Sequence, residues 1–206
     1  MRRAVAAVRR RAGGGDAGLT MVEVVVATVV MSFVLAIFTT AMLQLTRSGS
    51  RTQTVAQAQS QLNNAFLRLD TQIRYASAIS QQGTVGGDPY VEYLTTNSGS
   101  RVCTELRLHG GALQSRTWIQ PAAPAVPGPG NVTPTPWVAL ATNVSAATPF
   151  RFYDADSTLN FQRLELNLTA GGPPTARRTD VTFTALNTSL DSTGDTSECA
   201  EGRLIP

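Results

Sequence analysis

The sequence contains no lysine and only one histidine. All seventeen basic side chains among its 206 residues are arginines, and His109 is the single imidazole. With one histidine and no S-x-x-K or G-x-S-x-G pattern, no set of nucleophile, base and acid can be recognised. The sequence therefore predicts a protein that is not an enzyme and that uses no cofactor.

Cysteine is almost as scarce. Cys103 and Cys199 are the two cysteines, and they form no C-x-x-C pair. A tetrahedral metal site would need two further ligands, and only His109 could supply one, so no metal site is expected. If this part of the chain lies outside the cytoplasm, a single disulfide between the two cysteines is expected. The alternative is two unpaired thiols.

Positive charge is concentrated at the start of the chain. Five arginines lie in the first eleven positions: Arg2, Arg3, Arg9, Arg10 and Arg11. From Leu19 onward, twelve arginines stand against thirteen acidic residues, so this part of the chain is nearly neutral. It offers no basic stripe with interleaved aromatic residues, and nucleic acid is not an expected partner.

A long apolar run follows the basic leader. Residues 19–45 carry one charge, Glu23, and they exceed the length of about 20 helical residues that crosses a bilayer. The positive-inside rule places the N-terminus in the cytoplasm and the rest of the chain outside. The length disfavours a cleaved secretory signal, and the leader disfavours a buried core helix. A plain signal anchor leaves Glu23 unexplained, because a carboxylate in an apolar run is costly without a partner.

The stretch GLTMVEVVVA, residues 18–27, resembles the N-terminal processing site of type IV pilins and type II secretion pseudopilins. The resemblance implies that a prepilin peptidase removes the leader 1–18 by cutting between Gly18 and Leu19, and that Leu19 is then methylated. Glu23 would be the fifth mature residue, which in this family meets the N-terminal amine of a neighbouring subunit. Leu19 replaces the commoner phenylalanine, and Met21 replaces the commoner leucine.

Helical patterning continues beyond the apolar run. No proline occurs between Leu19 and Ser80. Within 46–80, apolar residues recur at spacings of three and four, as on one face of a helix. The positions are Val55, Ala58, Leu62, Phe66, Leu69, Ile73 and Ala76. We therefore expect 19–45 to be a transmembrane or filament-core helix, and 46–80 to be its amphipathic continuation.

The pattern changes to a period of two in residues 81–206. The stretches VCTELRLH, FQRLELNL and DVTFTAL alternate apolar and polar residues, and weaker candidates are YVEYLT, LQSRTWI, WVALATNV and FRFY. Such alternation predicts antiparallel strands with one face exposed to water. The proline-rich segment 120–136 is expected to be a loop. The predicted fold is α+β and pilin-like, with a long N-terminal helix packed on an antiparallel sheet. The stretch FRFYDADSTLNFQRLELNL and the following DVTFTALN, within residues 150–187, resemble the C-terminal part of minor pseudopilins of the J type and of related minor pilins.

One acidic turn has part of the residue spacing of a calcium-binding loop. Asp154, Asp156, Thr158 and Glu165 occupy positions one, three, five and twelve of an EF-hand-like loop. The sixth position is Leu159 where such a loop needs glycine, so an acidic hairpin turn is the favoured interpretation.

The leading functional hypothesis is a minor pilin or pseudopilin in a type IV pilus-like or type II secretion filament. The resemblance implies a single-pass protein of the bacterial cytoplasmic membrane with its ectodomain outside, which enters a filament on assembly. The implied partners are other pilin or pseudopilin subunits, the prepilin peptidase and a membrane assembly platform. The alternative is a membrane-anchored extracellular binding protein that never polymerises.

Overall fold

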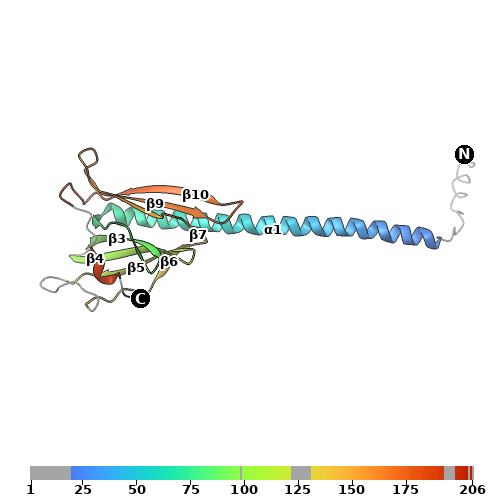
Figure 1. Cartoon of the computed structure of the whole chain (residues 1–206), viewed down its shortest axis with the longest axis horizontal. Helices are drawn as coiled ribbons and strands as arrows, with labels where there is room; N and C mark the ends of the chain where they lie inside the picture. The colour runs from blue at the N-terminus through green and yellow to red at the C-terminus, as the bar shows by residue number, and fades with distance from the viewer. Residues whose placement is uncertain (1–19, 98, 122–130, 193–197, 204, 206) are drawn as a thin grey trace, which may run out of the picture. The chain divides into compact units, whose positions relative to one another are not determined.

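The computed structural model describes residues 20–97, 99–121, 131–192, 198–203 and 205 (Figure 1). The leader 1–18, with Gly18 and the adjacent Leu19, lies outside the described residues, as does most of the predicted loop 120–136. The chain divides into two compact units, with the boundary between Gly49 and Ser50. One helix, α1 (Met21–Arg74), begins in the first unit and ends in the second.

In the first unit, α1 is apolar and exposed along its whole length. Its most apolar window has a mean hydropathy of 2.5, which is sufficient for a membrane span. The hydroxyl groups of this part bond within the helix, as when Ser32 Oγ donates to the Thr28 carbonyl and Thr39 Oγ1 to that of Leu35. Internal bonding lowers the penalty for placing a hydroxyl in lipid. The helix is thus compatible with single-pass anchoring in a membrane.

The second part of α1, residues 50–74, carries the expected buried stripe. Its buried positions are Val55, Ala58, Leu62, Ala65, Phe66, Leu69 and Ile73. The helix ends at Arg74, earlier than the expected residue 80, because Ala76–Ile79 is strand β1. Ala76 and Ile79 are fully buried; their spacing of three is that of a helix, and it also fits this strand because the register shifts between Ala76 and Ala78. Pairing of β1 with β3 decides between the two.

Two antiparallel sheets follow, where the sequence predicted one. The first has six strands in the order β1-β3-β4-β5-β6, with β2 paired to β3. The second has four strands in the order β10-β9-β7, with β8 paired to β9. The bounds of the first sheet, after β1, are β2 (Gly83–Val85), β3 (Asp88–Asn97), β4 (Ser100–His109), β5 (Ala112–Ile119) and β6 (Val138–Thr142). Those of the second are β7 (Val144–Ser145), β8 (Phe150–Tyr153), β9 (Arg163–Ala170) and β10 (Arg177–Thr184).

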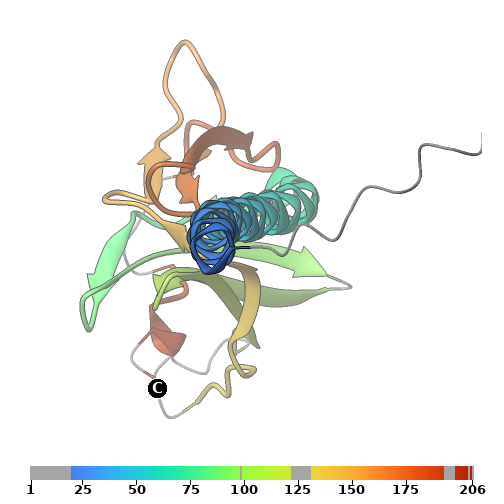
Figure 2. The same cartoon turned by 90° about the vertical axis from the view of Figure 1, so that its right-hand side faces the viewer.

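Residues 50–74 of α1 lie between the two sheets (Figures 1 and 2). Leu62 and Leu69 of the helix share one core with Leu106 of β4 and with Leu166 and Phe183 of the second sheet. Burying side chains of this size stabilises the fold by about 1.5–3 kcal/mol each. The fold is therefore α+β, with the helix packed on antiparallel sheets, as predicted.

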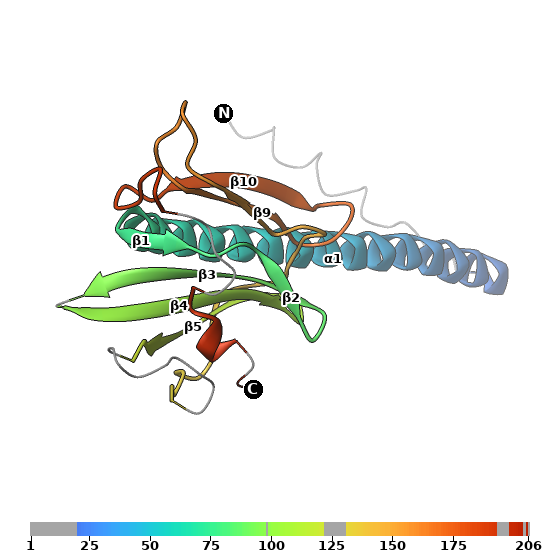
Figure 3. The same cartoon turned by 60° about the vertical axis from the view of Figure 1, so that its left-hand side comes forward.

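The prediction of one wet face per strand was wrong for the six-stranded sheet. In β4, Leu106 is fully buried on the helix side, but Glu105 on the other face is only 3% exposed. That face is covered by a segment from the end of the sequence, which includes the short 3₁₀ helix η1 (Ala200–Gly202) (Figure 3). We call residues 198–203 and 205 the C-terminal segment.

Candidate functional site

The first turn of α1 is organised by Thr20 and Glu23. The Glu23 amide donates to the Thr20 carbonyl at 2.9 Å and to the Thr20 hydroxyl oxygen at 3.3 Å. Thr20 is therefore an N-cap, and T-x-x-E is the spacing of a capping box. Glu23 also lies where the helix dipole favours a negative charge. These local effects give Glu23 a structural role that the sequence analysis did not consider.

The Glu23 carboxylate itself is available to a partner. Glu23 is exposed, and among the residues that the structure describes its carboxylate has no hydrogen bond or ion pair. The nearby side chains Val24, Ala27 and Met31 on the same helix are apolar. Among the described residues, the favourable local interaction of this carboxylate is thus the one with the helix dipole, because the cap at Thr20 uses the backbone amide of Glu23.

Cys103 and Cys199 are joined in a disulfide. The two sulfurs are 2.07 Å apart and the two Cα atoms 5.6 Å apart, across 96 positions of sequence. Both cysteines are fully buried in a small cluster with Leu94, Trp118 and Val132. The bond fixes the C-terminal segment to the centre of β4, on the face away from α1.

A buried arginine of β5, Arg116, holds the same segment through hydrogen bonds. Arg116 Nε donates to Glu105 Oε2 at 2.9 Å, and both side chains are less than 5% exposed. The other guanidinium nitrogens of Arg116 donate to the carbonyl oxygens of Gly202, at 2.9 Å, and Ile205, at 2.6 Å. Arg116 therefore links β4 to the C-terminal segment, and its buried charge is compensated by one carboxylate and two carbonyl groups.

A second buried ion pair joins the segment to β3. Arg203 donates from Nε to Glu92 Oε1 at 3.2 Å and from Nη2 to Glu92 Oε2. Glu92 is fully buried. Burial raises the pKa of Glu92 to about 7, against the opposing effect of Arg203. The neighbouring carboxylates Glu105 and Glu201 also raise this pKa.

Close packing of Gly202 on Trp118 completes this attachment. A Cβ added to Gly202 would lie 2.6 Å from ring atoms of Trp118, so only glycine fits. The Trp118 indole Nε1 donates to Glu201 Oε1 at 3.0 Å. The C-terminal segment is thus held by the disulfide, by the ion pairs Arg203–Glu92 and Glu198–Arg101, by the hydrogen bonds from Arg116 and by the packed indole.

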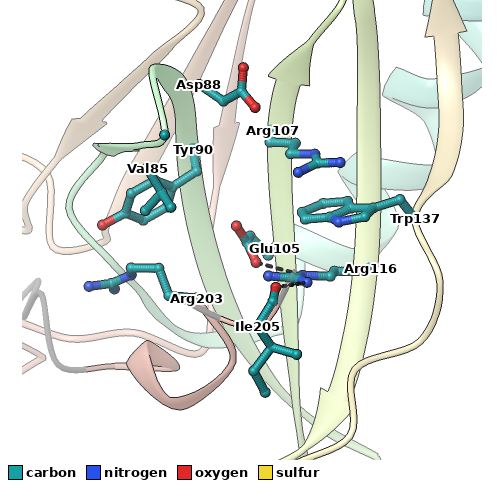
Figure 4. A pocket seen from close by; sticks show the side chains of 10 residues that line it. Val85, Asp88, Tyr90, Glu105, Arg107, Arg116, Trp137, Arg203 and Ile205 are labelled. Atoms are coloured by element: carbon teal, nitrogen blue, oxygen red, sulfur yellow. Dashed lines mark hydrogen bonds and ion pairs between the residues drawn. The ribbon is translucent and has the colours of Figure 1, made fainter. Parts of the chain in front are cut away.

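A cavity of about 220 Å³ opens beside this segment (Figure 4). It is lined by Val85, Gly86, Asp88, Tyr90, Glu105, Arg107, Arg116, Trp137, Arg203 and Ile205. The Cζ atoms of Arg107 and Arg116 lie 3.7 and 4.2 Å from the centre of the Trp137 ring. Figure 4 shows the indole between the two guanidinium groups. Each cation is attracted to the π system of the ring.

The acidic turn does not gather its side chains around one point. Asp156 Oδ1 accepts from the amides of Thr158 and Leu159, both at 2.8 Å, and these bonds hold the pKa of Asp156 below its usual value. Glu165, on β9, instead accepts from the Tyr153 hydroxyl at 2.5 Å. Among the described residues, no three His, Cys, Asp or Glu side chains are grouped to hold a metal. The turn has the hydrogen bonding of an Asx turn.

His109 is exposed at the end of β4. Its Nδ1 lies 2.7 Å from Asp88 Oδ2. The pair bridges the ends of β3 and β4 at the rim of the cavity, since Asp88 also lines it.

No protein-family model, curated protein or solved structure matches this chain.

The sequence analysis missed the buried ion pairs and the cavity. One signal was present, because three charged residues, Glu92, Glu105 and Arg116, lie within the predicted strands. The pattern assigned Glu105 to the side that faces water and assigned no side to the other two. Nothing in the sequence indicated that the C-terminal segment would cover these charges, because its partners lie 83 to 111 positions away.

Proposed function

We propose that this chain is a minor pilin or pseudopilin subunit of a type IV pilus-like or type II secretion filament. In this proposal a prepilin peptidase cuts between Gly18 and Leu19, and the apolar part of α1 then packs against other subunits. The observation that carries the proposal is the position of Glu23, an available carboxylate in the first turn of an exposed apolar helix and the last residue of the motif GLTMVE.

The chemistry of the first turn supports an assembly contact. Cleavage after Gly18 would create a free α-amine on Leu19, four residues before Glu23. An amine and a carboxylate that are both surrounded by apolar side chains lose much of their desolvation penalty when they pair. Pairing between neighbouring subunits would define how far one helix is displaced along the next. The cap at Thr20 would orient the turn that carries the carboxylate.

The distribution of apolar surface along α1 supports lateral helix packing. Residues 21–49 bury none of their large apolar side chains, whereas residues 55–73 bury seven positions against the sheets. The first part therefore needs lipid or another helix to cover it. In the membrane, lipid would cover this part of α1; in a filament, the helices of other subunits would cover it.

Mass spectrometry of the protein from the membrane fraction tests the processing step. We expect a mature chain that begins with methylated Leu19. A protein that retains Met1 and the leader in a cell with an active prepilin peptidase would exclude the proposal.

Cysteine cross-linking separates a filament subunit from the non-polymerising anchored protein. No cysteine of this chain is free among the described residues, so a single cysteine placed on α1 between Val24 and Leu45 would provide one defined thiol. We expect oxidation to join such variants to other helices at positions that recur every three to four residues. Equal or absent cross-linking at every position would favour the anchored alternative.

A further inference from the structure

The cavity beside Trp137 contains one guanidinium without a charged partner. Arg116 is paired with Glu105, and Arg203 is paired with Glu92. Arg107 donates from Nε to the neutral Gln114 Oε1 at 2.8 Å. Among the residues that the structure describes, it has no carboxylate within ion-pair distance. Its two terminal nitrogens therefore retain their capacity to donate.

The carboxylate nearest to Arg107 in the cavity lining is already engaged. Asp88 lies close enough to act electrostatically on Arg107, but its Oδ2 contacts His109 Nδ1 at 2.7 Å. Figure 4 shows Asp88 and Arg107 at the same end of the cavity, with the Arg107 guanidinium over the indole of Trp137. Burial lowers the pKa of Arg107, and the like charge of Arg116 on the other side of the indole acts in the same direction, whereas Asp88 and Glu105 raise this pKa. Among the described residues, Arg107 thus has charged neighbours but no ion-pair partner.

A second donor of the same stack lacks an acceptor. The indole Nε1 of Trp137 is buried and, among the residues that the structure describes, has no hydrogen-bond partner. Buried polar atoms are nearly always hydrogen-bonded in folded proteins. The stacked side chains Arg107 and Trp137 therefore both offer donors, and the missing partner in each case is an acceptor.

We propose that this cavity binds a small monocarboxylate, with its carboxylate on the terminal nitrogens of Arg107. A guanidinium presents two parallel N–H groups that match the two oxygens of a carboxylate. Arg116 and Arg203 are paired with Glu105 and Glu92, so Arg107 is the arginine of the lining that the carboxylate of a ligand would neutralise. A phosphate dianion would be repelled more strongly than a monocarboxylate by Asp88 and Glu105.

The size and the remaining lining limit the body of the ligand. A cavity of about 220 Å³ is smaller than the roughly 300–1,000 Å³ of sites for drug-sized molecules. Val85, Tyr90 and Ile205 add apolar surface to it. A carboxylate on a short hydrocarbon fits this description, whether it is a free short-chain acid or a glutamate side chain of another protein. The proposal is independent of filament assembly.

Indole signals in NMR spectra provide a direct test in the full-length chain in detergent micelles. The chain has two tryptophans; Trp137 lines the cavity, and Trp118 is bonded to Glu201 and serves as an internal reference. We expect sodium propionate, at constant ionic strength, to shift the Trp137 Nε1–H signal and the Arg107 Nε–H signal saturably. Trp118 should shift little. Propionamide, which has the same shape without charge, should have no saturable effect.

Two variants and one control test the role of the guanidinium. Arg107→Met should abolish saturable binding, and Arg107→Lys, which keeps the charge and loses the planar fork, should weaken it by about tenfold or more. Arg178→Met changes an exposed arginine of the other sheet and should bind propionate as the wild type does. Equal effects of propionate and propionamide on the wild type, or wild-type affinity in Arg107→Lys, would overturn the proposal.

A peptide distinguishes the two sources of the carboxylate. Acetyl-Ala-Glu-Ala-amide should compete with propionate if the natural ligand is a protein side chain, and its Gln counterpart should not. If propionate binds and the Glu peptide does not compete, the ligand is a free acid. If neither binds saturably, the cavity is not a carboxylate site.

Discussion

Arg203 donates two hydrogen bonds to the carboxylate of Glu92, which lies 111 positions earlier in the sequence and has no exposed surface. The pair connects the C-terminal segment to the strand next to β4. Removal of either partner would leave the other charge buried without compensation, which typically costs about 3–5 kcal/mol.

The stability of this domain should decrease as the pH rises from 5 to 8. Burial raises the pKa of Glu92 to about 7 from 4.5, so between these values the folded state binds more protons than the unfolded state, and deprotonation favours unfolding. Burial also raises the pKa of Glu105, which acts in the same direction. We expect a higher Tm at pH 5 than at pH 8, by about 2–4 °C for each kcal/mol. Near-UV circular dichroism would measure it.

The Glu92→Gln variant is the control for this pH dependence. It keeps a hydrogen-bonding side chain of the same size and removes the titrating group that faces Arg203. Its Tm should vary less between pH 5 and pH 8 than that of the wild type. An unchanged slope would assign the pH dependence to other groups.

Loss of the disulfide should strongly destabilise the second unit, which begins at Ser50. Cys103 and Cys199 close a loop with a sequence separation of 96, for which the chain-entropy model gives a stabilisation of about 4–5 kcal/mol. The double variant Cys103→Ala/Cys199→Ala should therefore unfold at a much lower urea concentration. Non-reducing peptide mapping of protein from the cell envelope should show the linked pair. Two alkylated thiols there would contradict both the bond and the export of the domain.

Gly18→Val should block maturation if the proposed cleavage is correct. A side chain at this position would obstruct the approach of the peptide bond to the peptidase. The variant should accumulate in the membrane with its leader attached, as measured by mass spectrometry. Trimming of the variant by the mass of residues 1–18 would show that the cleavage site is elsewhere.

Glu23→Gln and Glu23→Ala should separate the two roles of this residue. Glutamine can replace glutamate in a capping box, but it cannot form an ion pair with an amine. Under the proposed function both variants should be processed and hold a folded ectodomain, yet both should fail to enter filaments. Recovery of assembly in Glu23→Gln alone would assign Glu23 to helix capping. Wild-type assembly in both variants would remove Glu23 from the assembly mechanism.

The helix could be predicted from the sequence because its signals are local and periodic. The stripe from Val55 to Ile73 is buried as expected, and the buried leucines of β9 alternate as its pattern predicted. The end of α1 was misplaced because Ala76 and Ile79 fit two kinds of structure. Their assignment depends on pairing with β3, which periodicity within the segment cannot reveal.

The candidate site was less predictable because its contacts are distant in sequence. Glu105 has the position of a solvent-facing residue on its strand, and only Arg116 and the C-terminal segment make its burial tolerable. The disulfide was anticipated as one of two outcomes, since only two cysteines were available. The cavity around Arg107 and Trp137 forms only where β2, β5 and the C-terminal segment come together. No local sequence pattern predicts that arrangement.

The attachment of the C-terminal segment also sets an order of events during biosynthesis. Glu92, Cys103 and Glu105 are translated about a hundred residues before Cys199 and Arg203. Until then, the outer face of the six-stranded sheet has a free thiol at Cys103 and a carboxylate, Glu92, whose arginine partner has not yet been made. The second unit therefore cannot reach its final fold until Cys199 and Arg203 have been made, and an external oxidant must then accept the two electrons that Cys103 and Cys199 release when their sulfurs join.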